Sequence, residues 1–335
     1  MSASYRWIHR VWYEGAKSGL ILLPLSGIYW LVLKLRALLY RYGAFRTFKA
    51  HAPVIVVGNI TAGGTGKTPT VIWLVDELRS KGFTPGIVSR GYGGSKSGTS
   101  MRVDVDSDAA VVGDEPVLLA RRGRCPVVVD ADRVRAAAML VDEGVDLIIA
   151  DDGLQHLRLQ RDYEICVIDG ERGLGNCRLM PAGPLREPPA RLESVDRVLI
   201  NGKSEMPEAV NFELVAQEAS RLNASLIRPL PGFKDTTVHA VAGIGNPKRF
   251  FDLLRASGMQ VIEHSFPDHA AITRADVEFG DDFDVLMTEK DAVKLGANLP
   301  DKYWFVPVNL SMDKLKATEF IDHIESRLRP AGEAR

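Results

Sequence analysis

Residues 54–82 read VIVVGNITAGGTGKTPTVIWLVDELRSKG, an apolar stretch followed by a glycine-rich turn and a stretch with helical spacing. In a phosphate-binding loop, main-chain N–H groups surround the phosphates, a lysine reaches the outer ones, and the next hydroxyl binds Mg²⁺. The turn offers these groups in Thr61, Ala62, Gly63, Gly64, Thr65, Gly66, Lys67 and Thr68. The stretch therefore predicts a nucleoside triphosphate site between a strand and a helix. The alternative is a glycine-rich turn without a ligand.

One position departs from the general motif, because Thr61 stands where such a loop usually begins with glycine. The opening turn must then be made with a β-branched residue. Pro69 falls in the first turn of the expected helix, where its missing N–H removes no hydrogen bond. The surroundings of the motif therefore agree with a phosphate loop, although its first residue does not.

Beyond residue 50, expected strands and helices alternate, as in a parallel sheet covered by helices on both faces. The first series of strands is expected at residues 54–57, 86–89, 126–130, 147–150, 164–168 and 198–200. After an irregular stretch at 207–231, a second series has strands at 238–242, 261–265, 285–288 and 304–308, with helices at 247–257 and 314–327. The predicted fold class is α/β: a P-loop NTPase-like, mostly parallel core sheet at residues 51–230 and a smaller α/β domain at 231–335.

The first 50 residues differ in composition from the rest of the 335-residue chain. They carry eight Lys and Arg residues against one acid, a net charge of +7 in a chain of net charge −1. Residues 18–33 lack charge, but the run is interrupted by Pro24 and Gly27 and is shorter than the roughly 20 residues that span a bilayer. Apolar residues from Ile28 onward follow helical spacing. We expect a basic, apolar helix in the headgroup region of a membrane, with a packed core helix as the alternative.

Two adjacent acids, Asp151 and Asp152, end the apolar stretch VDLIIADDG. Carboxylates at that position in a P-loop protein hold Mg²⁺ directly or through water. Asp169 ends a similar stretch and is interpreted as a structural strand cap. The chain lacks an [NT]KxD guanine motif, so ATP is preferred over GTP. Partition-type ATPases have a second lysine where this loop has Ala62, so that class of ATPase is disfavoured. Three cysteines without a pairing or metal-binding spacing indicate a reducing compartment.

Further motifs make the chain resemble the tetraacyldisaccharide 4'-kinase family along nearly its whole length. They are VGNITAGGTGKTP, SRGYGG (89–94), VGDEP (112–116), DADR (130–133), DDGLQH (151–156), PAGPLREP (181–188), AGIGNPKRFF (242–251), FPDH (266–269) and TEKDAVK (288–294). The resemblance implies transfer of the γ-phosphate of Mg-ATP to the 4'-hydroxyl of an acylated glucosamine disaccharide 1-phosphate, a lipid A precursor. It also implies location at the cytosolic face of the bacterial inner membrane, without a nucleic-acid or obligate protein partner.

The resemblance also assigns roles to individual residues. Asp114 corresponds to the group that accepts the hydroxyl proton, and His269 to its partner from the second domain; the alternatives are a helix cap and a turn histidine. Arg133, Arg186 and Lys67 correspond to positions around the phosphates, where guanidinium and ammonium groups neutralise moving charge. We also assign Glu115 and Glu187 to the Mg²⁺ site with Thr68, Asp151 and Asp152, although Glu115 could be an ordinary acid of a first helical turn. Arg90 and Tyr92 are assigned to substrate or nucleotide contact, with a simple glycine turn as the alternative.

Two other functions are compatible with a P-loop and a membrane-associated segment. A membrane-tethered ATPase switch would hydrolyse ATP without an acceptor and would not need a pair formed by Asp114 and His269. A soluble small-molecule kinase would keep its activity after deletion of residues 1–50.

Overall fold

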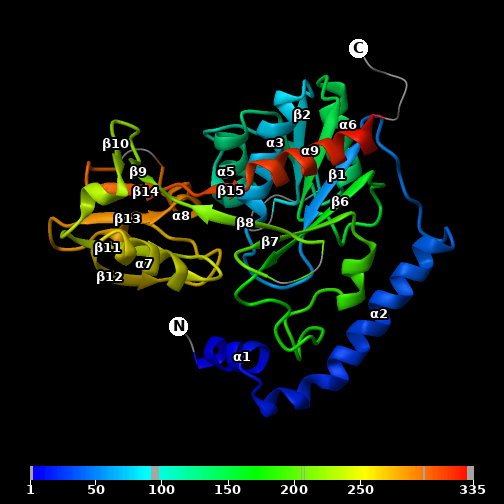
Figure 1. The fold of residues 1–335 in the computed structure, drawn as a ribbon, viewed down its shortest axis with the longest axis horizontal. Coiled ribbons are helices and arrows are strands. Elements are labelled where there is room, and N and C mark those ends of the chain that lie inside the picture. The colour runs from blue at the N-terminus through cyan, green and yellow to red at the C-terminus, as the bar shows by residue number, and fades with distance from the viewer. Residues whose placement is uncertain (1–2, 92–97, 205, 207, 297–298, 330–335) are drawn as a thin grey trace.

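The computed structural model describes residues 3–91, 98–204, 206, 208–296 and 299–329, which form two sheets and an N-terminal helical segment (Figure 1). The larger sheet has nine strands in the order β15-β8-β7-β6-β1-β5-β2-β4-β3. Only its edge pairs, β3 with β4 and β15 with β8, are antiparallel among the described residues. The strands are β1 (Val54–Gly58), β2 (Pro85–Ser89), β3 (Met101–Val103), β4 (Val127–Val129), β5 (Leu147–Asp151), β6 (Tyr163–Asp169), β7 (Arg197–Asn201), β8 (Val210–Val215) and β15 (Asn309–Met312).

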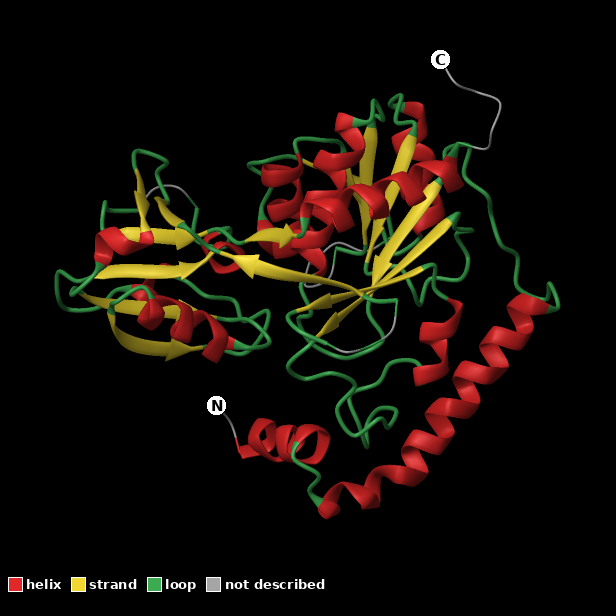
Figure 2. Ribbon diagram, in the orientation of Figure 1, coloured by secondary structure: helices red, strands yellow, loops and turns green. Residues whose placement is uncertain are grey.

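Helices cover both faces of this sheet (Figure 2), which is why its central strands are apolar on both sides. One face packs against α3 (Lys67–Ser80), α5 (Asp114–Gly123) and α9 (Lys314–Leu328). The other packs against α6 (Arg133–Asp142) and the loops that follow β5 and β6. Short helical turns lie at α4 (Ala109–Val112) and η2 (Pro189–Ser194). The predicted fold class of the core domain is confirmed.

The second sheet has six strands in the order β10-β9-β14-β13-β11-β12. They are β9 (Glu218–Arg221), β10 (Ile227–Pro229), β11 (Thr237–Ala242), β12 (Gln260–Ser265), β13 (Asp284–Thr288) and β14 (Tyr303–Val306). Its helical elements are α7 (Pro247–Ala256), α8 (Glu289–Ala292), η3 (Leu230–Phe233) and η4 (Arg274–Val277). Two separate apolar clusters lie within this domain, one around Trp304 and Phe251 and the other around Met287 and Tyr303.

The chain crosses between the two sheets twice, whereas the sequence predicted one boundary near residue 230. It enters the second sheet between β8 and β9 and returns between β14 and β15. Helix α9 then packs on the first core, where Phe320 stacks on Trp73 with ring centroids 6.1 Å apart. The crossing points depend on pairing between segments distant in the chain, β9 with β14 and β15 with β8.

The N-terminal segment forms α1 (Ala3–Tyr13), η1 (Lys17–Leu22) and the 19-residue helix α2 (Leu23–Arg41), which runs along the outside of the core domain (Figure 1). Pro24 lies in the first turn of α2, where it costs no hydrogen bond, so it begins the helix and does not interrupt it. The helix also continues through Gly27, although the sequence placed its start near Ile28. Within the described residues, Lys17–Arg41 is long and apolar enough to cross a membrane.

Candidate functional site

The glycine-rich turn connects β1 to α3 at the carboxyl edge of the large sheet. Gly63 and Gly66 have φ of 100° and 103°, a backbone conformation that strains other residues. Thr61 lies at an isolated antiparallel bridge with Leu185, and the N–H of Ala62 donates to the carbonyl of Pro184 at 2.7 Å. Thr61 is therefore bridged to a neighbouring segment, where a β-branched residue fits. This pairing explains why the loop begins without glycine.

Lys67 and Arg186 converge on Asp152 at the end of β5. The Lys67 ammonium lies 3.7 Å from Asp152 Oδ1, and Arg186 Nη1 donates to both carboxylate oxygens at 2.9 and 3.2 Å. Burial alone would raise the pKa of Asp152, but these two cations hold it below its ordinary value. The cluster gathers two cations beside the phosphate loop, where a triphosphate would place negative charge.

The neighbouring Asp151 has a different environment. Its side chain is buried, Ser89 Oγ lies 3.3 Å from its Oδ2, and its Oδ1 has no hydrogen-bond partner among the described residues. Burial, with the negative charges of Glu115 and Asp152, raises the pKa of Asp151 to about 7. A buried carboxylate with a free oxygen beside a second carboxylate fits a hard cation such as Mg²⁺.

The other expected metal ligands lie at different places around the loop. Thr68 is the second residue of α3. Glu187 accepts a hydrogen bond from Gln155 Nε2 at 2.6 Å, and Arg191 Nε lies 3.2 Å from its carboxylate. Glu115 is paired with Lys290 at 3.0 Å. In the described part of the chain, no group of three His, Cys, Asp or Glu side chains is arranged to hold a metal ion. Such a group is not required, because Mg²⁺ in phosphotransferases commonly needs only one or two carboxylates plus phosphate oxygens.

Asp114 and His269 meet across the two domains. Asp114 is the first residue of α5, and its Oδ1 lies 3.2 Å from His269 Nδ1. Burial would raise the pKa of Asp114, but the hydrogen bond with His269 and the charges of Lys290 and Lys294 lower it to about 2. The same hydrogen bond raises the pKa of His269 above its ordinary value.

Two lysines from α8 and the turn after it surround this pair. Lys290 Nζ lies 3.2 Å from Asp268 Oδ1 and 3.3 Å from His269 Nε2, in addition to its bond with Glu115. Lys294 Nζ lies 3.5 Å from Asp114 Oδ2. Both lysines come from TEKDAVK, a motif to which the sequence assigned no role, and their contacts became visible only after the domains were assembled.

The second domain also contacts the phosphate loop itself. A Cβ added at Gly245 would lie 2.9 Å from the main-chain nitrogen of Gly64, so only glycine permits this approach. Arg249 of α7 donates to Asn201 Oδ1 at 3.0 Å, and Asn201 Nδ2 donates to the carbonyl of Thr65 at 3.3 Å. The turn at residues 243–246 therefore lies against the loop.

The other residues singled out in the sequence, Arg133, Arg90, Tyr92 and Asp169, lie in different surroundings. Arg133 is buried, and its Nη2 donates to the main-chain carbonyls of Asp151 and Asp152 at 2.9 and 3.0 Å, so it fixes the end of β5. Arg90 is exposed directly after β2. Tyr92 lies outside the described residues. Asp169 accepts hydrogen bonds from the main chain of Glu171 and from Arg172, as a strand cap does.

Arg172 is a site residue that sequence reasoning missed. Its guanidinium contacts the carbonyl of Gly64 and pairs with Asp169 at 3.1 Å. Asn201 was also missed, although it ends strand β7 at the same edge of the sheet as Asp151. Position at a strand end was the one available signal for Asn201, because ligands of such sheets gather there. Arg172 lies in an irregular loop and had none.

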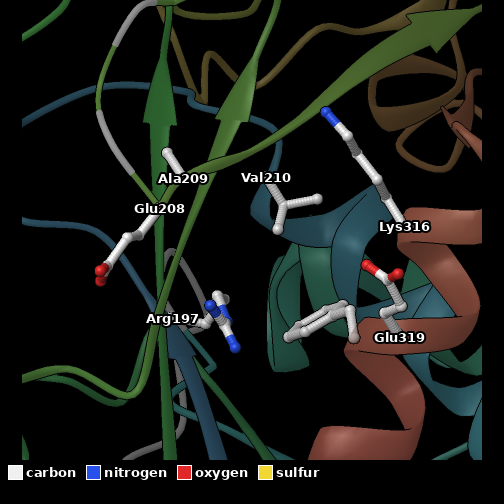
Figure 3. Close-up of a pocket in the computed structure, with 7 residues that line it drawn as sticks. Arg197, Glu208, Ala209, Val210, Lys316 and Glu319 are labelled. Atoms are coloured by element: carbon white, nitrogen blue, oxygen red, sulfur yellow. The ribbon is translucent and has the colours of Figure 1, made fainter.

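A small pocket of about 180 Å³ lies between the strands β7 and β8 and the helix α9 (Figure 3). Arg197, Glu208, Lys316 and Glu319 provide charges of both signs around it. Arg197 is the first residue of β7, at the opposite end from Asn201. This pocket is therefore separate from the groups gathered at the phosphate loop.

The comparisons with known proteins agree with this geometry. The family model described as tetraacyldisaccharide-1-P 4'-kinase (LpxK) matches residues 18–329. The tetraacyldisaccharide 4'-kinase of Nitrosococcus oceani is 48% identical over 91% of this chain and 90% of its own, and that of Pseudomonas aeruginosa is 45% identical over 95% of both. A crystal structure of LpxK from Aquifex aeolicus in complex with ATP has a TM-score of 0.76 and 27% identity, covering 91% of this chain and 98% of that one. The chain belongs to the tetraacyldisaccharide 4'-kinase family, and it is a kinase.

Proposed function

We propose that this chain transfers the γ-phosphate of ATP to the 4'-hydroxyl of a tetraacylated glucosamine disaccharide 1-phosphate at the cytosolic face of the inner membrane. The observation that carries the proposal is the contact between Asp114 and His269 at 3.2 Å, because a phosphotransferase with an alcohol acceptor needs a proton acceptor. Family membership supports the same reaction.

In the proposed reaction, the acceptor oxygen forms a bond to the γ-phosphorus while the bond from that phosphorus to the bridging oxygen of ADP breaks. The hydroxyl proton passes to the Asp114 carboxylate, which His269 orients. A pKa of about 2 makes Asp114 a weak base, but it keeps the carboxylate ionised and able to accept a proton. The transfer needs little basicity because the hydroxyl becomes acidic as its oxygen bonds to phosphorus.

The phosphate loop and its cations supply the charge stabilisation. Lys67 and Arg186, which both contact Asp152 in this structure, would bind the phosphate oxygens as negative charge moves toward ADP. Thr68, Asp151 and Asp152 are the residues that would hold Mg²⁺, with Glu115 and Glu187 close to the same loop. When bound, Mg²⁺ neutralises phosphate charge and aligns the β- and γ-phosphates.

The N-terminal helix supports a membrane-resident acceptor. Along α2, the least exposed positions are Ser26, Tyr29, Leu33, Arg36, Leu39 and Tyr40, so the polar side chains Ser26, Tyr29 and Arg36 face the protein. Most of the exposed positions of α2 are apolar, among them Leu23, Leu25, Ile28, Trp30, Leu31, Val32, Leu35 and Leu38, and the exposed charged side chains are Lys34 and Arg41. This distribution is the reverse of that of a helix in water and suits a lipid surface.

The test is a transfer assay with the full chain, ATP, Mg²⁺ and a tetraacylated glucosamine disaccharide 1-phosphate in anionic phospholipid vesicles. Mass spectrometry should detect a lipid product heavier by one phosphoryl group, and ³¹P–¹H NMR should place that group on the 4'-oxygen. Lys67→Met should abolish the product. Stoichiometric release of ADP and inorganic phosphate with no phosphorylated lipid would overturn the proposal in favour of an ATPase. Full activity of residues 51–335 on a deacylated acceptor would favour a soluble kinase.

A further inference from the structure

The side of α2 that faces the protein is bound to the main chain of the catalytic loops. Ser26 Oγ lies 2.9 Å from the carbonyl of Leu179 and accepts a hydrogen bond from the N–H of Ala182 at 3.0 Å. Tyr29 Oη donates to the carbonyl of Arg186 at 2.9 Å, and Arg36 Nη2 donates to the carbonyl of Gln155 at 2.8 Å. These contacts join the helix to segments that are more than 100 residues distant in the chain.

The two carbonyls held by Tyr29 and Arg36 belong to residues that shape the site. Arg186 binds Asp152 with its guanidinium and donates its N–H to the carbonyl of Ile60, just before the phosphate loop, at 2.7 Å. Gln155 follows the acids of β5, and its side-chain nitrogen donates to the carbonyl of Asn59 at 3.1 Å and to Glu187 at 2.6 Å. A closed network of hydrogen bonds therefore includes α2, the Arg186 loop, the loop after β5 and the start of the phosphate loop.

We propose that Tyr29 and Arg36 are positioning residues, which fix Arg186 and Asp152 relative to Lys67 through main-chain hydrogen bonds from the lipid-facing helix. Neither side chain acts on a reacting atom. Removal of either hydrogen bond should raise the activation free energy of transfer by more than the free energy of that one bond, because small displacements of phosphate-binding groups reduce transition-state stabilisation. The inference rests on the proposed function and adds that α2 arranges the active site in addition to attaching it to lipid.

Tyr29→Phe removes the phenolic hydroxyl, and Arg36→Met removes the guanidinium group with its positive charge; each substitution keeps the apolar part of the side chain. In the vesicle transfer assay, we expect kcat to fall by about tenfold or more, while KM for ATP and for the acceptor stays within about twofold. Co-sedimentation with the vesicles should be unchanged. The matched control is Tyr303→Phe, which removes a hydrogen bond from a tyrosine hydroxyl to the carbonyl of Val277, 3.2 Å long, in the second domain. It should keep the wild-type kcat.

Wild-type kcat in both variants would overturn the inference. So would a loss of activity accompanied by an equal loss of vesicle binding, since α2 would then act only as an anchor. The same variants are also compared for ATP turnover without acceptor. If the wild-type chain phosphorylates no disaccharide, the proposed function fails. The positioning role is still supported if ATP turnover without acceptor falls in Tyr29→Phe but not in Tyr303→Phe. Unchanged turnover contradicts it.

Discussion

The carboxylate of Asp114 and the imidazole of His269 lie 3.2 Å apart, although 155 residues separate them in the chain. Asp114 begins α5 in the core domain, and His269 lies in the loop after β12 in the second domain. Their contact therefore exists only while the two domains are together. In the same interface the second domain contacts the glycine-rich loop, so in the proposed reaction nucleotide binding and assembly of the proton acceptor would occur in one place.

We expect Asp114→Asn to lower kcat for phosphoryl transfer by about 10²–10⁴-fold, because asparagine keeps the shape of the side chain but cannot accept the proton. ATP affinity should change little, because the expected nucleotide contacts come from the phosphate loop. Transfer assays and equilibrium titration with an ATP analogue measure the two quantities separately. Asp106→Asn, at an exposed acid of the same domain, is the control. An Asp114→Asn variant that transfers phosphate at the wild-type rate would show that another group accepts the proton.

The pKa of His269 should lie above 6.5, since its hydrogen bond with Asp114 stabilises the charged imidazole. Because the pKa of His269 is higher in the folded than in the unfolded protein, the charged imidazole stabilises the fold. This contribution is fully present below pH 6.5 and is lost as the pH rises through the folded-state pKa. Heteronuclear NMR of the histidine ring gives the pKa directly, and denaturant unfolding over the same pH range gives the stability. The Asp114→Asn variant should lower the pKa. Identical titration curves in both proteins would contradict the contact.

Gly245→Ala tests the approach of the second domain to the phosphate loop. The added methyl group would lie 2.9 Å from the nitrogen of Gly64, and main chain cannot move aside as a flexible side chain can. We expect kcat to fall by about tenfold or more, with weaker ATP binding, because the domains cannot close to the same distance. Gly280→Ala is the matched control, because a Cβ at Gly280 meets no atom within 4 Å. Equal kinetics in both variants would mean that this contact does not form during turnover.

The three cysteines should differ strongly in reactivity. Burial raises the pKa of Cys166 to about 12 and that of Cys125 to about 11, whereas Cys177 is exposed. Because the thiolate is the reactive form, iodoacetamide at mildly alkaline pH should modify Cys177 alone in the folded protein. Intact mass and peptide mapping should show one adduct in the native chain and three after denaturation. Rapid labelling of Cys166 in the native protein would contradict its buried place in β6.

Local sequence was sufficient for the main elements of both sheets. The expected strand at 54–57 appears as Val54–Gly58, the one at 164–168 as Tyr163–Asp169, and the helix at 314–327 as Lys314–Leu328. These segments have long apolar runs or clear helical spacing, and a buried parallel strand must be apolar on both faces. The strands β3, β8, β9, β10 and β15 were missed, and of these β9 and β15 pair with segments distant in the chain, β14 and β8.

The glycine-rich turn after β1, the acids at the end of β5 and the unusual composition of the N-terminal segment could all be read from the sequence, because each is a property of consecutive residues. The contacts between distant residues became visible only in the folded chain: Asp114 with His269, Lys290 with Glu115, Arg172 with Gly64, and Tyr29 with Arg186. The return of the chain to the first sheet at β15 was likewise visible only in the structure. Spacing along a helix or strand fixes local geometry, whereas contacts between domains depend on the packing of the complete fold.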